Sequence, residues 1–369
     1  MKLPAHQLRR QTVRSFVERE IAPNIGKWER QERIDPGLWQ AAAKIGLLGL
    51  RIPTEYGGAG LDDYRFRFIV LEELARAGAA SVNAGISLVD DLVGPYLVDL
   101  GTDEQKRRWL PGLWPGTTTA AIAMTEPGAG SDLHGIRTRA VRDGDEWVLN
   151  GSKTFITNGG HADLVVVVAR TGERQLSLFV VEDGMPGFSR GEPLETMGRR
   201  AEAVTELFFD HVRVPAANLL GTEGKGMRHL MERMSIACFA LACAESALRW
   251  TLDYTRERSA FGSRIAEFQS ARFALVEMTT EIEVTRAYLE ARVLDLGAGT
   301  LTDTDAAKAK WWTTELFQRV LTRCVQLHGG YGYMLAYPIA RAFVDGRIQA
   351  IYGGTTEIMK EVIGRSLLA

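Results

Sequence analysis

Residues 164–182, LVVVVARTGERQLSLFVVE, decide the architecture expected for this chain. They contain two short runs rich in valine, leucine and phenylalanine that are separated by the turn GER, a pattern typical of neighbouring β-strands. Further runs of this kind are AAIAM (120–124), EWVLNG (146–151), KTFIT (153–157) and ELFFDHVRV (206–214). A small β domain is therefore expected over residues 117–222.

On both sides of this β domain the apolar residues recur with helical periodicity. Helix starts in the first part are Asp35 followed by Pro36, and the capping box Thr102 to Gln105. In the last part, long helices are expected from EGKGM (223–227), within 265–278 and over 303–330. The fold class is thus α+β, with an N-terminal helical domain (1–116), the central β domain (117–222) and a C-terminal helical bundle (223–369). A site between such layers would suit a flat cofactor.

Composition and charge exclude several classes of protein. Lys and Arg number 44 against 46 Asp and Glu, so no basic excess would attract nucleic acid. The longest apolar runs, 164–169 and 236–244, are shorter than the roughly 18 residues that a membrane span needs. The three cysteines lack paired spacing, and we interpret them as buried thiols in a reducing compartment: Cys238, Cys243 and Cys324.

The first 17 residues carry four basic residues and no acid, as a transit peptide would. Their apolar positions continue into EREIAPNI (18–25) as one amphipathic pattern. We therefore interpret this segment as the first structural helix and expect a cytoplasmic location.

The C-terminal stretch IQAIYGGTTEIMKEVIGRSL (348–367) contains a helix preceded by two glycines. Thr355 can cap this helix. The apolar face of the helix comprises Ile358, Val362, Ile363 and Leu367. Gly353 and Gly354 would let an anionic or carbonyl group approach the backbone N–H donors, but they bring no acid or base.

Two other motifs, MTEPGAGSD (124–132) and TFITNGG (154–160), combine turn glycines with hydroxyl groups that can line a ligand. Each alone is explained nearly as well by a plain β-turn. Together with six more segments in order, they make the chain resemble the acyl-CoA dehydrogenase family over residues 8–368. The other segments are TEYGGAG (54–60), GTDEQKRRWLPGL (101–113), VRVPAANLLG (212–221), RERSAFGSRIAEFQ (256–269), QLHGGYGY (326–333) and IYGGTTEIMKE (351–361).

The resemblance implies a C-terminal four-helix bundle, FAD as cofactor and a homotetramer built as a dimer of dimers. The residues that it places around FAD are Met124, Thr125, Ser131, Phe155, Thr157, Arg258, Phe261, Gln269, Gln326, Gly329, Gly330, Thr355 and Glu357. Of these, Thr125 would bind the pyrimidine end of the flavin and Thr157 its N5 region. Those from Arg258 to Gly330 would reach the FAD of a neighbouring subunit, and Thr355 and Glu357 would lie near the adenosine half.

This sequence departs from the family pattern at three positions. Phe155 stands where a tryptophan is common, which makes the aromatic wall smaller. Val344 replaces an arginine, so a local ion pair is expected to be missing. Many members have a glutamate as the catalytic base where this chain has Gly353.

A minority of the family, typified by the long-chain and isovaleryl enzymes, places the base on a helix of the C-terminal domain. The matching residue is Glu232 in GMRHLMERMSIACFALACAES (226–246). The residues three, four and seven positions further on would share its face, which turns apolar at once: Ser235, Ile236 and Phe239. The alternative is an ordinary surface pair between Glu232 and Arg228, one turn back.

The reaction implied by the resemblance is α,β-dehydrogenation of an acyl-CoA thioester to a trans-2-enoyl-CoA. Glu232 would abstract the α-proton, a hydride would pass to flavin N5, and the N–H of Gly353 would bind the thioester oxygen. Substrate contacts are assigned to Ser131, Arg233, Tyr352 and Gly353; Arg233 could instead pair with a neighbouring carboxylate. An electron-transfer flavoprotein is the expected acceptor.

Two alternatives stay open at this point. One is a flavin monooxygenase or oxidase of the same fold that acts on a non-CoA substrate, and the other is a helical interaction protein without flavin. No metal site is expected, because the histidines lack ligand spacing: His134, His161 and His328. A carboxylate introduced at position 353 is expected to be tolerated, since it would point into the same cleft.

Overall fold

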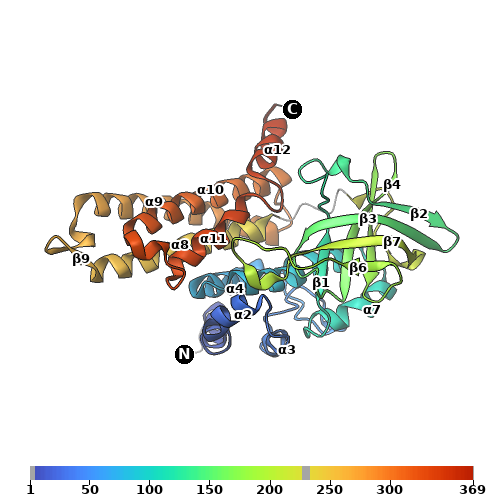
Figure 1. Cartoon of the computed structure of the whole chain (residues 1–369), viewed down its shortest axis with the longest axis horizontal. Helices are drawn as coiled ribbons and strands as arrows, with labels where there is room; N and C mark the ends of the chain where they lie inside the picture. The colour runs from blue at the N-terminus through green and yellow to red at the C-terminus, as the bar shows by residue number, and fades with distance from the viewer. Residues whose placement is uncertain (1–4, 227–232, 369) are drawn as a thin grey trace.

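A computed structural model describes residues 5–226 and 233–368 of the chain. Figure 1 shows an elongated molecule with the β domain at one end, the helical bundle at the other and the N-terminal helices packed along both. The N-terminal helices are α1 (Ala5–Phe16), α2 (Ile25–Gln31), α3 (Gly37–Lys44), α4 (Tyr64–Ala77), α5 (Ala80–Ser87), the π-helix η4 (Leu88–Val93), α6 (Gly94–Leu100) and α7 (Asp103–Leu113). The C-terminal helices are α8 (Met234–Glu257), α9 (Gln269–Gly297), α10 (Asp303–His328), α11 (Pro338–Gly346), the 3-10 helix η11 (Arg347–Ala350) and α12 (Thr356–Leu368).

Eight strands form the central sheet, in the order β6-β7-β3-β2-β4-β5-β8 with β1 parallel to β4. Their bounds are β1 (Ala120–Ala123), β2 (Arg139–Asp143), β3 (Glu146–Ile156), β4 (Leu164–Gly172), β5 (Gln175–Glu182), β6 (Phe188–Arg190), β7 (Thr205–Pro215) and β8 (Leu219–Leu220). A two-stranded hairpin, β9 (Ser259–Ala260) and β10 (Ser263–Arg264), lies at the far tip of the bundle (Figure 1).

The unbroken apolar run of β4 is explained by burial on both faces of the sheet. Val166 and Val168 belong to the large core shared with the helices, whereas Val165 and Val167 belong to a separate core within the β domain. Successive side chains of a strand point to opposite faces, so a strand covered on both sides needs apolar residues at every position. The expectation of a β domain between helical parts is confirmed.

Some details of the sheet differ from expectation. EWVLNG and KTFIT are one strand, β3, which continues through a register shift between Leu149 and Gly151 in its pairing with β7. The strands β2, β6 and β8 had no matching expectation, because β2 is mostly exposed and the other two are three residues long or shorter.

The expected helix starts have mixed outcomes. Thr102 and Gln105 form the expected capping box at α7. Asp35 does not cap α3: its carboxylate accepts hydrogen bonds from Lys27 at 2.6 Å and from Gln31 at 3.1 Å. These hydrogen bonds, of which the one from Lys27 has the largest effect, lower the pKa of Asp35 to about 2. Within EGKGM, Glu223 and Gly224 form a turn and Gly226 is the first helical residue, while Met227 lies outside the described residues.

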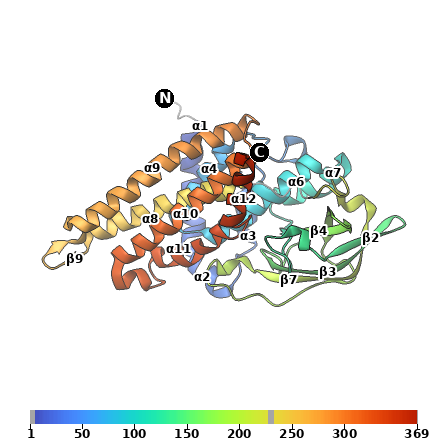
Figure 2. The ribbon, with the colours of Figure 1, turned by 90° about the horizontal axis from the view of Figure 1, so that it is seen from above.

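The bundle is built from α8, α9 and α10, which run side by side away from the β domain (Figure 2). α8 packs against both α10 and the N-terminal α4, and α12 crosses α10. In α12 the buried apolar residues are Met359 and Ile363, while Leu367 is exposed, so the expected apolar face is shifted toward Met359.

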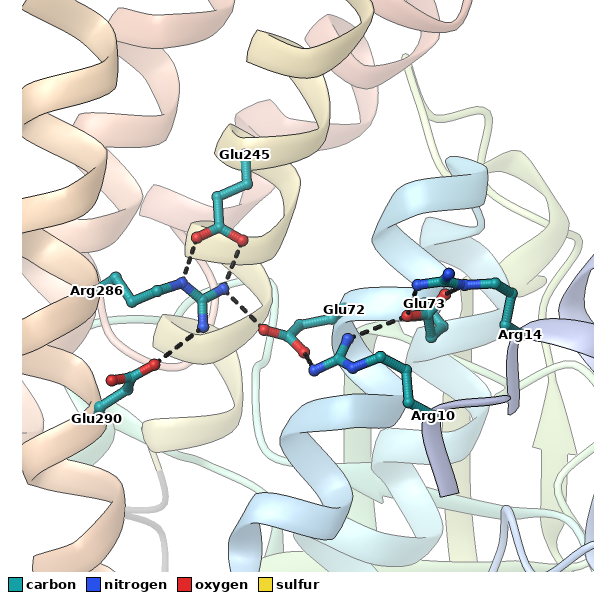
Figure 3. Close-up of polar contacts among 7 residues, drawn as sticks. All are labelled: Arg10, Arg14, Glu72, Glu73, Glu245, Arg286 and Glu290. Atoms are coloured by element: carbon teal, nitrogen blue, oxygen red, sulfur yellow. Dashed lines mark hydrogen bonds and ion pairs between the residues drawn. The ribbon is translucent and has the colours of Figure 1, made fainter. Parts of the chain in front are cut away.

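An ion-pair network ties the N-terminal helices to the bundle (Figure 3). Arg286 of α9 binds Glu245 of α8 at 2.5 Å and Glu72 of α4 at 2.7 Å. Glu72 also pairs with Arg10 of α1. The neighbouring Glu73, whose side chain is almost fully buried, binds Arg10 at 3.0 Å and Arg14 at 2.9 Å. Four helices are therefore cross-linked at one junction.

The three cysteines form no disulfide; Cys238 and Cys324 are buried and Cys243 is half-buried. Across the described ranges, no helix combines the length and apolar character needed to cross a membrane.

Candidate active site

The loop that follows β1 carries Met124 and Thr125 and is anchored to strand β3. The N–H of Thr154 donates to the carbonyl oxygen of Thr125 at 2.9 Å. Lys153 Nζ donates to the carbonyl oxygen of Met124 at 2.9 Å and to Glu126 Oε1 at 2.8 Å. The loop geometry is therefore set by a lysine that sequence reasoning passed over.

Lys153 is buried completely, so its charge is maintained by its partners. Burial lowers the pKa of Lys153 to about 8, against the opposing pull of Glu126. Glu126 in turn accepts backbone N–H bonds from Arg137 and Thr138 at 2.7 and 2.9 Å. The sequence signal that could have revealed this pair is a lysine at a strand position where the alternation of the strand calls for an apolar residue. A lysine buried at such a position requires a partner.

Open backbone and an exposed aromatic ring lie beside this loop. Added Cβ atoms at Gly128 and Gly130 would meet nothing within 4 Å. Phe155 is 67% exposed at the end of β3 and has a φ of 59°. Ser131 is exposed and Thr157 half-buried. This corner of the β domain thus offers hydroxyl groups and an aromatic face to a ligand.

The stretch from Tyr352 to Thr355 forms the loop before α12. Gly353 and Gly354 have φ of +62° and +91°, the left-handed region that favours glycine. Lys310, buried in α10, donates to the carbonyl oxygen of Gly354. The Thr355 hydroxyl accepts from the N–H of Ile358 at 3.3 Å, which confirms the expected cap.

A side chain at position 353 would collide with α8. An added Cβ would lie 2.4 Å from Cδ1 of Ile236. A glutamate at position 353 would require the end of the Ile236 side chain to move, and the expected tolerance of that substitution stays a prediction.

Glu232 lies outside the described residues, and so does Arg228. α8 begins at Met234, after Glu232, so a helix face shared with Glu232 stays a prediction. Of the residues expected on that face, Ser235 and Phe239 are buried and Ile236 is half-buried. Arg233 immediately precedes α8, is buried, and its Nη1 lies 3.5 Å from the carbonyl oxygen of Asp303 at the start of α10.

At the opposite end of the molecule, four expected residues line one groove of the bundle. The groove has a volume of about 470 Å³, is open to solvent and is lined in part by Arg258, Gln326, Gly329 and Gly330. Added Cβ atoms at either glycine would meet nothing within 4 Å. His328 forms the groove wall and stacks on Tyr254 with ring centroids 4.2 Å apart. The volume is in the range of small-molecule sites.

Phe261 and Gln269 lie at the same tip, and Phe261 is 99% exposed. Figures 1 and 2 place this tip, marked by β9, far from the β domain. One chain therefore does not bring Arg258, Phe261 and Gln269 together with Thr125 and Thr157. Glu357 is exposed on the first turn of α12, next to Thr355.

A buried charged cluster that sequence reasoning missed lies between the β domain and the bundle. Arg199 pairs with Glu202, and its guanidinium lies 5.1 Å from the ring centroid of Tyr352. The N–H of Arg199 donates to Asp345 Oδ1 at 2.6 Å. Thus Asp345, which follows Val344, has Arg199 as a partner although the arginine common at 344 is missing. The signal, a doubled arginine in MGRRAE, gave no indication of burial.

Within the described ranges, no group of three His, Cys, Asp or Glu side chains is arranged to hold a metal ion.

Models of three protein domains match the chain in sequence order. The acyl-CoA dehydrogenase N-terminal domain matches residues 4–117, the middle domain 121–212 and the C-terminal domain 227–368. The chain belongs to the acyl-CoA dehydrogenase family. The expected family is thereby confirmed, and the protein is an oxidoreductase enzyme, as its curated relatives are.

Individual members of the family are similar over nearly the whole chain. The mitochondrial long-chain specific acyl-CoA dehydrogenase of Rattus norvegicus is 44% identical over 375 residues, covering 99% of this chain and 86% of the relative. The crystal structure of an acyl-CoA dehydrogenase from Geobacillus kaustophilus is 44% identical, with a TM-score of 0.95 over 99% of this chain and 98% of that one. A glutaryl-CoA dehydrogenase from Mycobacterium smegmatis in complex with FADH2 is 30% identical, with a TM-score of 0.93 over 99% and 95%. These structures confirm the fold class.

Proposed function

We propose that this chain is an FAD-dependent dehydrogenase that converts an acyl-CoA thioester into its trans-2-enoyl-CoA. The observation that carries the proposal is the loop at Gly353, where the base position of many family members is vacant and closed by Ile236. A side chain that removes the α-proton must then come from elsewhere. Glu232, four residues before Ile236 in the sequence, is our candidate.

The residues present fit FAD. The corner of the β domain offers the Thr125 and Thr157 hydroxyls and the exposed ring of Phe155 for a flavin. The bundle groove offers an arginine, Arg258, and open glycine backbone for a dinucleotide. We therefore assign the thirteen residues expected around FAD to the cofactor site, with Ser131 shared by the substrate. FAD, when bound, supplies the electron sink for the reaction.

The protein groups proposed to act on the substrate are a base and an N–H donor. A base for an α-proton works best when its pKa is close to the working pH, and burial against the thioester and flavin would raise the pKa of a glutamate in that direction. The N–H of Gly353 would stabilise the charge that develops on the thioester oxygen. Lys310 holds the next carbonyl group, that of Gly354, and so fixes the orientation of this loop.

Substrate contacts are proposed for Ser131, Tyr352, Gly353 and Arg233. Arg233 is the least direct, because its guanidinium is buried against the start of α10. We assign Arg233 to the floor of the substrate site. Burial is the main cause that lowers the pKa of Lys310, and the nearby positive charge of Arg233 lowers it further.

A homotetramer is proposed because the two halves of the cofactor site lie far apart in one chain. Arg258, Phe261 and Gln269 at the bundle tip would complete the flavin site of a second subunit. Large exposed apolar side chains on the bundle support such contacts: Phe261, Phe273, Val276, Val284 and Trp312. We propose an electron-transfer flavoprotein as the electron acceptor. The cytoplasmic location of the protein and the domain boundaries after residues 116 and 222 remain predictions.

The test is anaerobic titration of the FAD-loaded protein with a panel of acyl-CoAs. A matched acyl-CoA is expected to bleach the flavin absorbance without an electron acceptor. A protein that takes up FAD but is bleached by no acyl-CoA would favour the oxidase or monooxygenase alternative, and one that takes up no FAD would favour an interaction protein.

A further inference from the structure

A strained turn beside the candidate site holds a buried carboxylate that the proposed reaction does not use. The turn, residues 199–203, begins and ends with non-glycine residues in the left-handed region: Arg199 has a φ of 54° and Ala203 a φ of 46°. Such conformations persist where the surrounding structure holds them. Here the N–H of Arg199 donates to Asp345 at 2.6 Å, and the N–H of Asn158 donates to the Glu202 carbonyl oxygen at 2.9 Å.

These contacts direct the two oxygens of Glu202 toward different partners. One oxygen pairs with the guanidinium of Arg199. The other, Oε2, lies 3.5 Å from the hydroxyl of Thr157. Glu202 and Arg199 are both buried. The carboxylate meets the candidate site at the hydroxyl of Thr157, and its partner Arg199 meets it at the ring of Tyr352.

Several charged or titratable groups face Glu202 or its near neighbours. They are Arg199, Asp345 on α11, Tyr352 after η11, Cys243 on α8 and Glu29 on α2. Burial raises the pKa of Glu202 to about 7, against the attraction of Arg199, and the charge of Asp345 adds to the rise. Both protonation states of Glu202 are therefore accessible near neutral pH.

We propose that Glu202, acting through Thr157, accepts the proton that the site must release when the reduced cofactor gives its electrons to an acceptor protein. The inference rests on the proposed function, since it needs FAD beside Thr157. Reduced FAD, when bound, would supply two electrons to the acceptor and one proton to the oxygen of Thr157. The hydroxyl proton of Thr157 passes at the same time to Oε2 of Glu202. The hydroxyl is restored, and the carboxylate becomes a carboxylic acid.

In this proposal the two glutamates act in different half-reactions. Glu232 would take the α-proton while the substrate is oxidised, and Glu202 would take a proton only while the cofactor is reoxidised. Arg199 is a positioning residue, because it holds one oxygen of Glu202 and leaves Oε2 facing Thr157.

The test compares two half-reactions of the FAD-loaded protein: reduction of the flavin by acyl-CoA and its reoxidation by an electron acceptor. Glu202→Gln keeps the shape and a hydrogen bond but removes the proton acceptor. Its bleaching by acyl-CoA should stay within about twofold of wild type, while reoxidation by the small one-electron oxidant ferricenium should slow on the order of a hundredfold. The matched control is Glu195→Gln, an exposed carboxylate of the preceding loop, which should change neither rate.

Two measurements on the wild-type protein support the variant. The reduced-minus-oxidised infrared spectrum of the wild type should contain a negative carboxylic-acid band, because Glu202 becomes protonated on reoxidation. The spectrum of Glu202→Gln should not contain this band. The reoxidation rate of the wild type should rise with pH through about 7. Reoxidation of Glu202→Gln at the wild-type rate, or equal slowing of both half-reactions, would overturn the proposal. Should the variant not fold, a pH-independent wild-type reoxidation rate without the infrared band would do the same. A wild-type protein that is not bleached at all would instead mean that the proposed function has failed.

Discussion

Ile236 of α8 occupies the space into which a side chain at position 353 would project, because a Cβ built on Gly353 would lie 2.4 Å from its Cδ1 atom. Helix and loop are thus complementary: the glycine lets α8 approach, and the isoleucine closes the position where many family members carry their base. Because position 353 carries no carboxylate, the proposed active site needs a base from another part of the chain.

Gly353→Ala should destabilise the protein by about 1–3 kcal/mol. The left-handed backbone costs a residue with a Cβ roughly 1–2 kcal/mol, and the contact with Ile236 adds to it. Urea unfolding measures the loss. Adding Ile236→Val, which removes Cδ1, should recover the steric part; equal stability of Gly353→Ala and wild type would contradict the described loop.

Lys310→Met should leave FAD binding intact but lower the rate of flavin bleaching by acyl-CoA. The substitution removes the hydrogen bond to Gly354 and frees the loop that carries the Gly353 N–H. Stopped-flow absorbance measures the rate. The control is Lys308→Met, two residues away, whose ammonium pairs with Asp305 at 3.5 Å and is partly exposed. An unchanged rate in Lys310→Met would show that the loop needs no anchor.

Arg286→Met should lower the free energy of unfolding by about 2 kcal/mol or more. Its guanidinium neutralises Glu245 and Glu72, and removing one member of a half-buried network leaves carboxylates without a counter-charge. Denaturant unfolding of Arg319→Met provides the comparison, since that arginine makes a looser, more exposed pair with Glu281 and should cost less than 1 kcal/mol. Equal losses in the two variants would argue against a structural role for the junction in Figure 3.

Glu73 should make the stability of the junction dependent on acidic pH. Burial opposes its ionisation, but hydrogen bonds from Arg14 and Arg10 outweigh burial and lower the pKa of Glu73. A carboxyl whose pKa is lower in the folded than in the unfolded state contributes stability above the unfolded value, about 4.3, and loses it as the pH falls through the folded value. The stability difference between wild type and Glu73→Gln should therefore shrink below about pH 4. The comparison is Glu104→Gln, an exposed carboxylate outside the junction, whose substitution should cost less than that of Glu73 at neutral pH.

Much of the fold followed from local sequence patterns, and the buried charges did not. The apolar run of β4 and the capping box at Thr102 act within a few residues, so they could be interpreted without tertiary contacts. Asp35 has the composition of a cap but binds Lys27 instead, which only packing could decide. Met359 rather than Leu367 is buried in α12 because α10 crosses the helix near its start.

The same limit applies to the candidate site. Thr125, Thr157 and Gly353 were recognised from motifs, whereas their supports Lys153 and Lys310 are lysines that look solvent-exposed in the sequence. Arg199 and Glu202 are brought to Thr157 by a turn whose conformation is fixed from α11, far along the chain. Long-range contacts of this kind leave no periodic signal.

The most direct test of the central claim is the flavin absorbance of Glu232→Gln after anaerobic mixing with an acyl-CoA that bleaches the wild type. The account predicts that this variant binds FAD and the thioester, seen as a perturbed flavin spectrum, and that the flavin stays oxidised, while Glu223→Gln bleaches like wild type. Rapid bleaching of Glu232→Gln would contradict the assignment of the base and with it the proposed mechanism.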